Sequence, residues 1–468
     1  MATLIRNGRI VTAVDDYVAD ILVDESRITT IGLHLDVGGD VEVHDASGLL
    51  VLPGGVDVHT HLDMATPTAR TIDTFGSGTR AAAFGGTTTL VDFCTPLPGQ
   101  SPLNALEDWH RLRESACVDV GAHMILLDAN PGTLDEMKTL VRHEGVSSFK
   151  LFMAYPGALM LDDGALFKAM RVAGANGAMT CVHAENGHVI QALVDEAVAQ
   201  GLKAPKYHAL TRPAILEGEA VHRAICLAEL AETPLYIVHL SAAQSLAAVT
   251  EARDRGISVH AETCPHYLFL NADEYERPGF EAAKYVMTPP LRDHSHQPHL
   301  WRGLKTDDLQ VVSTDHCPFC FNEQPHGLRY SKQQGVDSFS RIPNGAPGVE
   351  TRLSLVFDGA VVTHGMSVNR FVEITATAPA KLFGLFPKKG TIAVGSDGDL
   401  VLFDPAERWT IRAAEHHSRV DYSLFEGRTP TGRVKKVFVR GECIVDGTRW
   451  LGREGMGRYL RRGASGRP

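Results

Sequence analysis

The feature that most constrains the fold is an alternation of short apolar runs with longer segments of helical periodicity. There are eight apolar runs, at residues 56–61, 87–93, 120–127, 147–153, 179–184, 235–240, 258–263 and 310–315. Between them lie helix-length segments at residues 103–117, 134–144, 164–176, 190–200, 213–231 and 242–255. Alternating strands and helices predict a parallel sheet, and eight such units predict an α/β fold of the (β/α)8 TIM-barrel type. A doubly wound open sheet is the alternative, but no Gly-x-Gly-x-x-Gly turn follows the first run.

Both ends of the chain have a different pattern, made of short strand-like runs and turns without a long helix. We expect a hairpin at residues 4–11, because alternating apolar residues flank an Asn7-Gly8 turn. Residues 437–445 have a similar pattern and predict a second hairpin. The two ends are therefore expected to meet in one small domain of the β-sandwich type.

This pattern divides the chain into four parts. Residues 1–53 and 388–460 would form the two halves of the β-sandwich domain, and residues 54–387 would form the barrel inserted between them. An apolar helix near residues 378–386 would close the barrel. The basic, glycine-containing segment 461–468 would be a flexible tail. A chain of 468 residues is long enough for a barrel and a smaller module.

Charge, hydropathy and cysteine content exclude several classes of protein. The formal net charge of -11 argues against a protein that binds nucleic acid or an anionic membrane surface. No charge-free apolar run approaches the length of a membrane span, and no basic segment leads into an apolar core, so we expect neither a membrane span nor a secretory signal. The eight cysteines favour free thiols in a reducing cytoplasm. Cys317 and Cys320 have CxxC spacing, which we interpret as packing thiols, with a metal or redox role as the alternative.

Ionisable residues gather at the carboxyl ends of the predicted strands. His59 and His61 end the first run, and their side chains point the same way because strand side chains alternate. The later runs add four more such residues, which are Lys150, His183, His239 and Asp315. TIM-barrel enzymes carry their catalytic groups at this face. Four histidines and an acid in one layer predict a metal site.

Lys150 is the unusual member of this group, since an ammonium ion repels metals and is costly to bury. A desolvated, neutral lysine amine can add carbon dioxide to give an anionic carbamate. The two oxygens of that carbamate could bridge two cations. A salt-bridged lysine is the alternative, and the surrounding histidines favour the bridge.

Several short motifs together resemble the cyclic amidohydrolases, and within them the dihydropyrimidinases and D-hydantoinases. The resemblance covers nearly the whole chain, and its motifs are GGVDVHTHLDM at 54–64, GGTTT at 85–89, FKLFMAY at 149–155, VHAEN at 182–186, VHLS at 238–241, PPLR at 289–292, TDHCPF at 314–319 and PNG at 343–345. The family resemblance implies a hydrolase that opens the cyclic amide of dihydropyrimidines and 5-substituted hydantoins to give N-carbamoyl amino acids. It also implies a cytoplasmic homo-oligomer, a tetramer or a dimer, whose partner is a small-molecule substrate.

The resemblance also implies two Zn²⁺ ions per subunit. His59, His61 and Asp315 would hold one ion and His183 and His239 the other, while Lys150, modified to N6-carboxylysine, would bridge both. Two such ions can lower the pKa of a shared water.

The same resemblance assigns catalytic and substrate-binding roles. Asp315 would carry the proton to the leaving nitrogen, and Tyr155 would hold the developing oxyanion. Thr288 and Asn344 would orient the ring amides through backbone atoms, although ordinary turn residues are the competing interpretation. Asp57 would either orient a histidine or have a plain structural role.

Three relatives of this pattern are disfavoured by particular residues. Dihydroorotases carry an arginine shortly after the His-x-His pair, where this chain has Leu62-Asp63-Met64. Allantoinases usually lack the tyrosine found here at position 155, and non-catalytic scaffold relatives have lost metal ligands that this chain keeps. Met64, Phe93 and Leu159 are expected to line an apolar pocket for the ring substituent.

Overall fold

The computed structural model describes residues 2–66, 68–325 and 327–464. Eight parallel strands form one sheet in the order β13-β12-β11-β10-β9-β8-β7-β6, which confirms the predicted barrel. The strands are β6 (Gly55–Thr60), β7 (Thr87–Cys94), β8 (Asp119–Ile125), β9 (Ser148–Phe152), β10 (Met179–His183), β11 (Leu235–Ile237), β12 (Val259–Thr263) and β13 (Val311–Val312). Every residue of these strands is buried, as is usual for a parallel sheet covered on both faces.

The barrel closes between its first and last strands. Thr60 and His316 form a parallel bridge there, and the His61 N–H donates to the His316 carbonyl at 2.9 Å. The fully buried Arg352 lies across the seam, where it donates to the carbonyls of Val56 at 3.1 Å and Val312 at 2.9 Å. These bonds compensate for the short β13 and fix the two strand ends that carry the candidate site.

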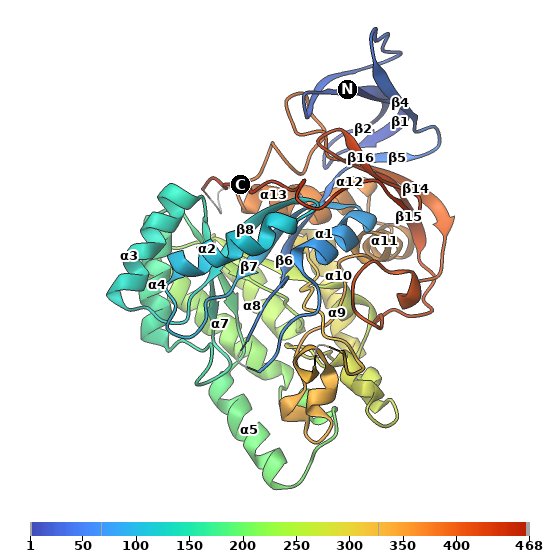
Figure 1. Cartoon of the computed structure of the whole chain (residues 1–468). Coiled ribbons are helices and arrows are strands. Elements are labelled where there is room, and N and C mark those ends of the chain that lie inside the picture. The colour runs from blue at the N-terminus through green and yellow to red at the C-terminus, as the bar shows by residue number, and fades with distance from the viewer. Residues whose placement is uncertain (1, 67, 326, 465–468) are drawn as a thin grey trace.

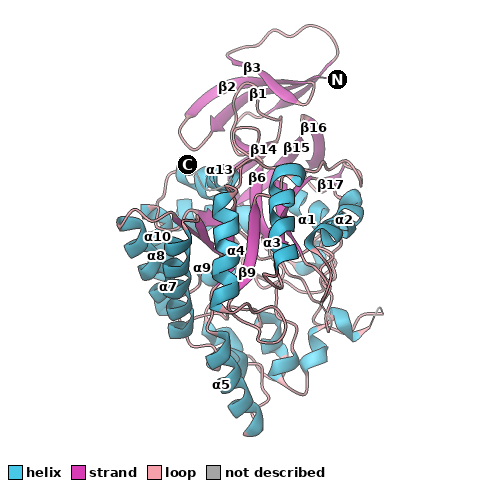
Figure 2. Cartoon of the chain, turned by 90° about the vertical axis from the view of Figure 1, so that its left-hand side faces the viewer, coloured by secondary structure: helices cyan, strands magenta, loops and turns pink. Residues whose placement is uncertain are grey.

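Helices surround the barrel, and Figure 2 shows α3 and α4 in front of β9. The longer helices are α1 (Phe75–Phe84), α2 (Pro102–Leu112), α3 (Pro131–Thr139), α4 (Asp163–Ala175), α5 (Gly187–Ala199), α7 (Ala214–Ala231), α8 (Ala243–Asp254) and α10 (Gln297–Thr306). The short ones are α6 (Tyr207–Leu210), α9 (Pro265–Phe269), α11 (Arg352–Phe357), α12 (Val368–Val372) and α13 (Ala378–Leu382). Ser101, Asn130 and Asp162 cap α2, α3 and α4 by accepting a backbone N–H of the first turn. The helix expected near residues 378–386 is α13.

The two ends of the chain meet in one nine-stranded sheet, drawn in blue and red in Figure 1. Its strands are β1 (Ala2–Val11), β2 (Asp16–Asp24), β3 (Arg27–Gly32), β4 (Val41–Asp45), β5 (Leu50–Pro53), β14 (Leu400–Arg408), β15 (Thr431–Val439), β16 (Glu442–Asp446) and β17 (Arg449–Trp450). Antiparallel pairing of β5 with β14 joins the amino-terminal and carboxyl-terminal halves. Ile5, Val51, Leu402 and Phe438 belong to the core that covers this join.

The hairpin expected at residues 4–11 is wrong, because these residues lie in the single strand β1. A two-residue hairpin of this kind needs positive φ at both central residues. Asn7 has φ 61, but Gly8 does not adopt a positive φ, and the pairing with β2 shifts register between Ile5 and Gly8. The Asn-Gly pair therefore makes a bulge. The hairpin at residues 437–445 is confirmed, since Arg440 and Gly441 between β15 and β16 have φ 52 and φ 83.

The carboxyl-terminal segment packs against the barrel as far as it is described. Arg462 is 5% exposed, and its guanidinium donates to the Ala122 carbonyl at 2.5 Å and to the Ser148 hydroxyl at 2.7 Å. The flexible tail expected over residues 461–468 is thus not seen at Arg462, and residues 465–468 lie outside the described part. Among the described residues, no helix has the length and apolar character that a membrane crossing requires.

Candidate metal centre and ring-binding site

His59, His61 and Asp315 form a buried group that could hold a metal ion. Their ligand atoms lie within 4.8 Å of one another, and the Nε2 atoms of His59 and His61 lie 3.1 and 3.2 Å from Asp315 Oδ1. Burial lowers the pKa of His61 to about 4, with Asp315 acting in the opposite direction. Burial would raise the pKa of Asp315, but the two imidazoles hold it well below its usual value. A neutral imidazole and an ionised carboxylate are the forms that bind metals.

His183 and His239 form a second pair beside the first. His183 ends β10 and His239 follows β11, and His183 Nδ1 lies 2.9 Å from His239 Nε2. Burial, with the neighbouring His183, holds the pKa of His239 well below its usual value. The ring centroids of His59 and His239 are 5.3 Å apart, so the two pairs share one space.

Two glutamates behind the histidines fix which ring nitrogen faces this space. Glu262 contacts Nδ1 of His59, and Glu185 Oε2 lies 2.9 Å from Nε2 of His183. A carboxylate accepts the ring N–H, so in the neutral form of each ring the lone pair lies on its other nitrogen, which faces Asp315 or His239. Each histidine pair thus has one carboxylate that selects the tautomer suited to a metal.

The charges around His59 attract a cation. Burial alone would lower the pKa of His59, but Glu262 and Asp315 raise it to about 9. In the described part of the chain, His61 Nδ1 and His239 Nδ1 are buried nitrogens without a hydrogen-bond partner. Unsatisfied buried nitrogens beside a carboxylate fit a metal better than they fit a packed core.

Lys150 lies in β9 next to both pairs and is fully buried. Its Nζ lies 4.9 Å from the centre of the Phe93 ring and 5.1 Å from that of Phe152. Among the described residues, no carboxylate oxygen lies within 4.0 Å of this amine. Burial lowers the pKa of Lys150 to about 8, although Asp315 acts in the opposite direction. The side chain thus has the reactivity that carbamate formation needs and lacks the salt bridge of the alternative interpretation.

The three residues predicted to contact the ring lie together. Tyr155 is in the loop after β9, and the side chains of Thr288 and Asn344 lie close enough to its phenol to lower its pKa. Burial nevertheless raises the pKa of Tyr155 to about 12, so the phenol keeps its proton. The ring centroids of Tyr155 and His183 are 5.5 Å apart, which places the phenol beside the second histidine pair.

Three site residues outside glycine have a left-handed backbone. The φ angles are 66 at Tyr155, 39 at His239 and 47 at Asp315. Such conformations are costly for residues with a Cβ and persist where the surrounding structure enforces them. Their occurrence at three positions of one group agrees with a functional site.

Asp57 links the first strand of the barrel to the residues after the last strand and does not contact an imidazole. Its carboxylate accepts the Thr314 hydroxyl at 2.6 Å and the backbone N–H of His59 at 3.2 Å, and it lies 3.8 Å from Arg352. The acid that orients the His59 ring is Glu262, which our sequence interpretation missed. An acid within the buried strand β12 was the available signal for it.

The three residues expected to line a substituent pocket lie in different surroundings in the structure. Phe93 is 2% exposed and stacks on His61, with centroids 5.1 Å apart, so it packs behind the histidines. Leu159 is partly exposed and packs in the same cluster as Tyr155, while Met64 packs beside Phe319. Leu159 therefore remains the best candidate for contact with a ring substituent.

The cysteines agree with the free-thiol interpretation. All eight cysteines are free. Cys317 Sγ lies 3.8 Å from the Asn344 carbonyl, whereas Cys320 Sγ lies 3.6 Å from the Arg419 carbonyl. The two CxxC thiols thus face different partners, as packing thiols would.

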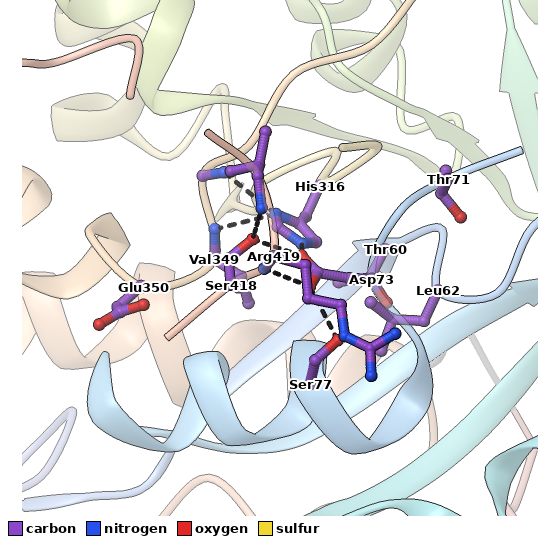
Figure 3. Close-up of polar contacts among 12 residues, drawn as sticks. Thr60, Leu62, Thr71, Asp73, Ser77, His316, Val349, Glu350, Ser418 and Arg419 are labelled. Carbon is purple, nitrogen blue, oxygen red and sulfur yellow. Dashed lines mark hydrogen bonds and ion pairs between the residues drawn. The ribbon is translucent and has the colours of Figure 1, made fainter. Parts of the chain in front are cut away.

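A second polar network supports the residue after Asp315. Figure 3 shows Asp73 among the His316 ring, the Arg419 backbone and Ser77 of α1, with contacts of 3.1, 2.8 and 2.8 Å. On its other side the His316 ring accepts the Gly348 N–H at 3.1 Å. This network ties the strand end that carries Asp315 to the segment that follows Asn344.

These features define a metal-binding hydrolase barrel, and comparison with known proteins places the chain more closely. The amidohydrolase family model matches residues 50–444, so the chain belongs to the amidohydrolase family. It is 49% identical over 465 residues to a D-hydantoinase of Streptomyces coelicolor, covering 98% of each chain. It is 47% identical to a D-hydantoinase of Geobacillus stearothermophilus, covering 100% of this chain and 98% of that protein. A crystal structure of dihydropyrimidinase from Brevibacillus agri is similar at 48% identity and a TM-score of 0.97, with complete coverage of both chains.

Proposed function

We propose that this protein hydrolyses the cyclic amide of 5-substituted hydantoins and dihydropyrimidines, giving N-carbamoyl amino acids. The observation that carries the proposal is the convergence of two histidine pairs, Asp315 and a buried, unpaired lysine beside a protonated tyrosine. Full-length similarity to proteins named D-hydantoinase and dihydropyrimidinase supports the same reaction. The D enantiomer of a 5-substituted ring is expected to be preferred.

The metal site we propose uses the residues of both pairs. His59, His61 and Asp315 would hold one Zn²⁺, His183 and His239 a second, and carboxylated Lys150 would contribute to both. When bound, such ions supply Lewis acidity toward a carbonyl and a lowered pKa of water. The chain's own residues then control geometry, proton transfer and the exclusion of bulk water.

Three side chains would act on the ring. Asp315 accepts a proton from the attacking water and passes it to the ring nitrogen as the carbon–nitrogen bond breaks. The Tyr155 hydroxyl donates to the carbonyl oxygen as negative charge develops there, and its pKa of about 12 keeps the donor protonated. Thr288 and Asn344, on either side of that hydroxyl, would orient the ring amides.

Two alternatives are less consistent with these residues. An allantoinase-type hydrolase would not need the Tyr155 hydroxyl, which here lies beside Thr288 and Asn344. A non-catalytic scaffold would have no use for two glutamates that select metal-binding tautomers. A homo-oligomeric assembly and a cytoplasmic location stay predictions of the family resemblance.

A hydrolysis panel on the zinc-loaded protein tests the proposal. The substrates are dihydrouracil, hydantoin, both enantiomers of a 5-substituted hydantoin, and allantoin. Ring opening of the hydantoins and dihydrouracil, with allantoin left intact, is expected. Hydrolysis of allantoin alone would favour the allantoinase alternative. A protein that takes up no zinc and leaves every ring intact would favour the scaffold.

A further inference from the structure

Lys332 is a buried lysine that the proposed chemistry does not use. It begins a short 3-10 helix, Lys332–Gly335, and its side chain is fully buried. The ammonium donates to three backbone carbonyls, at 2.7 Å to Val286 and at 2.6 Å each to Pro343 and Gly345. An ammonium has three protons, so these contacts use its whole donor capacity.

The charge of Lys332 has no carboxylate counterpart nearby. Within the described part of the chain, no acidic oxygen lies within 4.0 Å of its Nζ. Burial lowers the pKa of Lys332 to about 7, with the Cys317 thiol acting in the opposite direction. The three carbonyl acceptors favour the protonated form, because a neutral amine has only two protons to donate. Burying a cation in this way is unfavourable for stability, since an apolar side chain of similar length would fill the same space. The three carbonyls are therefore the feature that explains a lysine at this position.

These carbonyls belong to the two segments that carry the ring-binding candidates. Val286 lies two residues before Thr288, and Pro343 and Gly345 flank Asn344. The Val286 carbonyl also accepts the Gly345 N–H at 3.2 Å, so both segments meet at the oxygen that Lys332 binds. Gly345 has φ 146, and a Cβ there would collide with the backbone of Cys317. The segment around Asn344 thus packs tightly against Cys317, and the Lys332 ammonium binds the carbonyls on both sides of Asn344.

The same contacts affect the Asn344 N–H. The Pro343 carbonyl and this N–H belong to one peptide group, and a cation on the oxygen draws electron density from the nitrogen. No described residue accepts a hydrogen bond from the Asn344 N–H. The Tyr155 phenol interacts with the Asn344 side chain. The residue with the polarised backbone N–H, Asn344, thus also has its side chain beside Tyr155, the proposed oxyanion donor.

We infer that Lys332 is a positioning residue for the substrate ring, which holds the Val286–Thr288 and Pro343–Gly345 segments together and strengthens the Asn344 N–H as a donor to a ring carbonyl. This inference rests on the proposed function, since the ring it positions is that of the hydantoin. Lys332 does not touch the metal-binding group, so its loss should affect ring binding and leave the metals in place.

Steady-state kinetics on hydantoin test this inference with two variants and a matched control. Lys332→Met keeps the length of the side chain and removes its donors. Lys332→Arg keeps the buried charge but replaces three converging protons with a planar fork. The control is Lys389→Met, because Lys389 is also buried but binds Asp119 and Asp399, which join the barrel to the small domain. Bound zinc and the melting temperature are measured for every protein.

Both Lys332 variants are expected to raise KM for hydantoin by about 10-fold or more, with the zinc content unchanged. Lys389→Met should lower the melting temperature and leave KM as in the wild type. If Lys332→Met does not fold, Lys332→Arg decides the outcome. An unchanged KM in a folded Lys332 variant would overturn the inference even if the protein is less stable. A wild-type protein that leaves every hydantoin intact would instead refute the proposed function, and the inference with it.

Discussion

Replacing Glu262 with glutamine should weaken metal binding while leaving the fold intact. Glu262 Oε1 contacts the His59 ring and accepts the backbone N–H of His239 at 3.0 Å. Its Oε2 accepts the Tyr236 hydroxyl at 2.9 Å. A glutamine with its carbonyl oxygen at the Oε1 position keeps the first two contacts. Its amide nitrogen can donate to Tyr236, because a hydroxyl group also accepts hydrogen bonds. The substitution therefore removes one negative charge and the acceptor of the Tyr236 hydroxyl proton, and it keeps the other contacts of Glu262.

The size of the effect follows from what that charge does. The carboxylate orients the His59 ring and increases the electron density on the nitrogen that faces Asp315. Removing such a partner typically weakens metal binding by about 10- to 100-fold, or about 1.4 to 2.8 kcal/mol. Because only the bond donated by the Tyr236 hydroxyl is lost, we expect the melting temperature of the metal-free protein to fall by about 4 °C or less.

A competition titration of Zn²⁺ against a chelating indicator at neutral pH measures this effect. Tyr236→Phe is the matched control, since it removes the hydroxyl from Oε2 and keeps the charge on Glu262. We expect the control to bind zinc nearly as tightly as the wild type and Glu262→Gln to bind it 10- to 100-fold more weakly, by the same approximate range. Equal affinity in the wild type and Glu262→Gln would show that the carboxylate does not act through His59.

Three further predictions concern the ring-binding residues and the support of the site. Tyr155→Phe should lower kcat on hydantoin by about 100-fold or more with little change in bound zinc, and an unchanged kcat would remove the tyrosine from the mechanism. Leu159→Glu should reduce turnover of an aryl-substituted hydantoin more than that of hydantoin itself, whereas equal losses would refute the substituent contact. Asp73 would gain a raised pKa from burial, but its bond with His316 lowers that pKa below the ordinary value. It therefore contributes stability above about pH 4 that is lost as the pH falls. In Asp73→Asn the melting temperature should therefore fall less steeply than in the wild type as the pH is lowered below about 4. The same pH dependence in both proteins would contradict this.

The barrel and the clustering of ionisable residues at its strand ends could be predicted from the sequence because parallel strands leave a simple pattern. Each strand is buried on both faces, so it appears as a short apolar run, and an ionisable residue at its end is conspicuous. His183 at the end of β10 and Lys150 within β9 were recognised in this way. The joining of the two chain ends was also foreseeable, since both carry strand-like runs and neither carries a long helix.

Contacts across the barrel could not be predicted in the same way. Strand alternation shows which face a side chain occupies but not which side chain of another strand it meets. Asp57 was a plausible partner for a histidine, yet the ring of His59 meets Glu262, a residue 203 positions away in the chain. The turn predicted at Asn7-Gly8 failed for a related reason, because Gly8 lies against the Val51 side chain of another strand, where a Cβ would collide, and this contact cannot be read from the local sequence. Lys332 lies outside any strand and carries no periodic signal.

The number of zinc ions per chain, measured for the wild type and for Lys150→Ala, tests the central claim most directly. The site described here predicts two ions in the active wild-type protein. It predicts at most one ion in Lys150→Ala, with hydantoin hydrolysis lost, because the side chain that would join the two histidine pairs is removed. Two ions in Lys150→Ala with unchanged turnover would contradict a lysine-bridged binuclear site, as would full activity of a wild-type protein that binds a single ion.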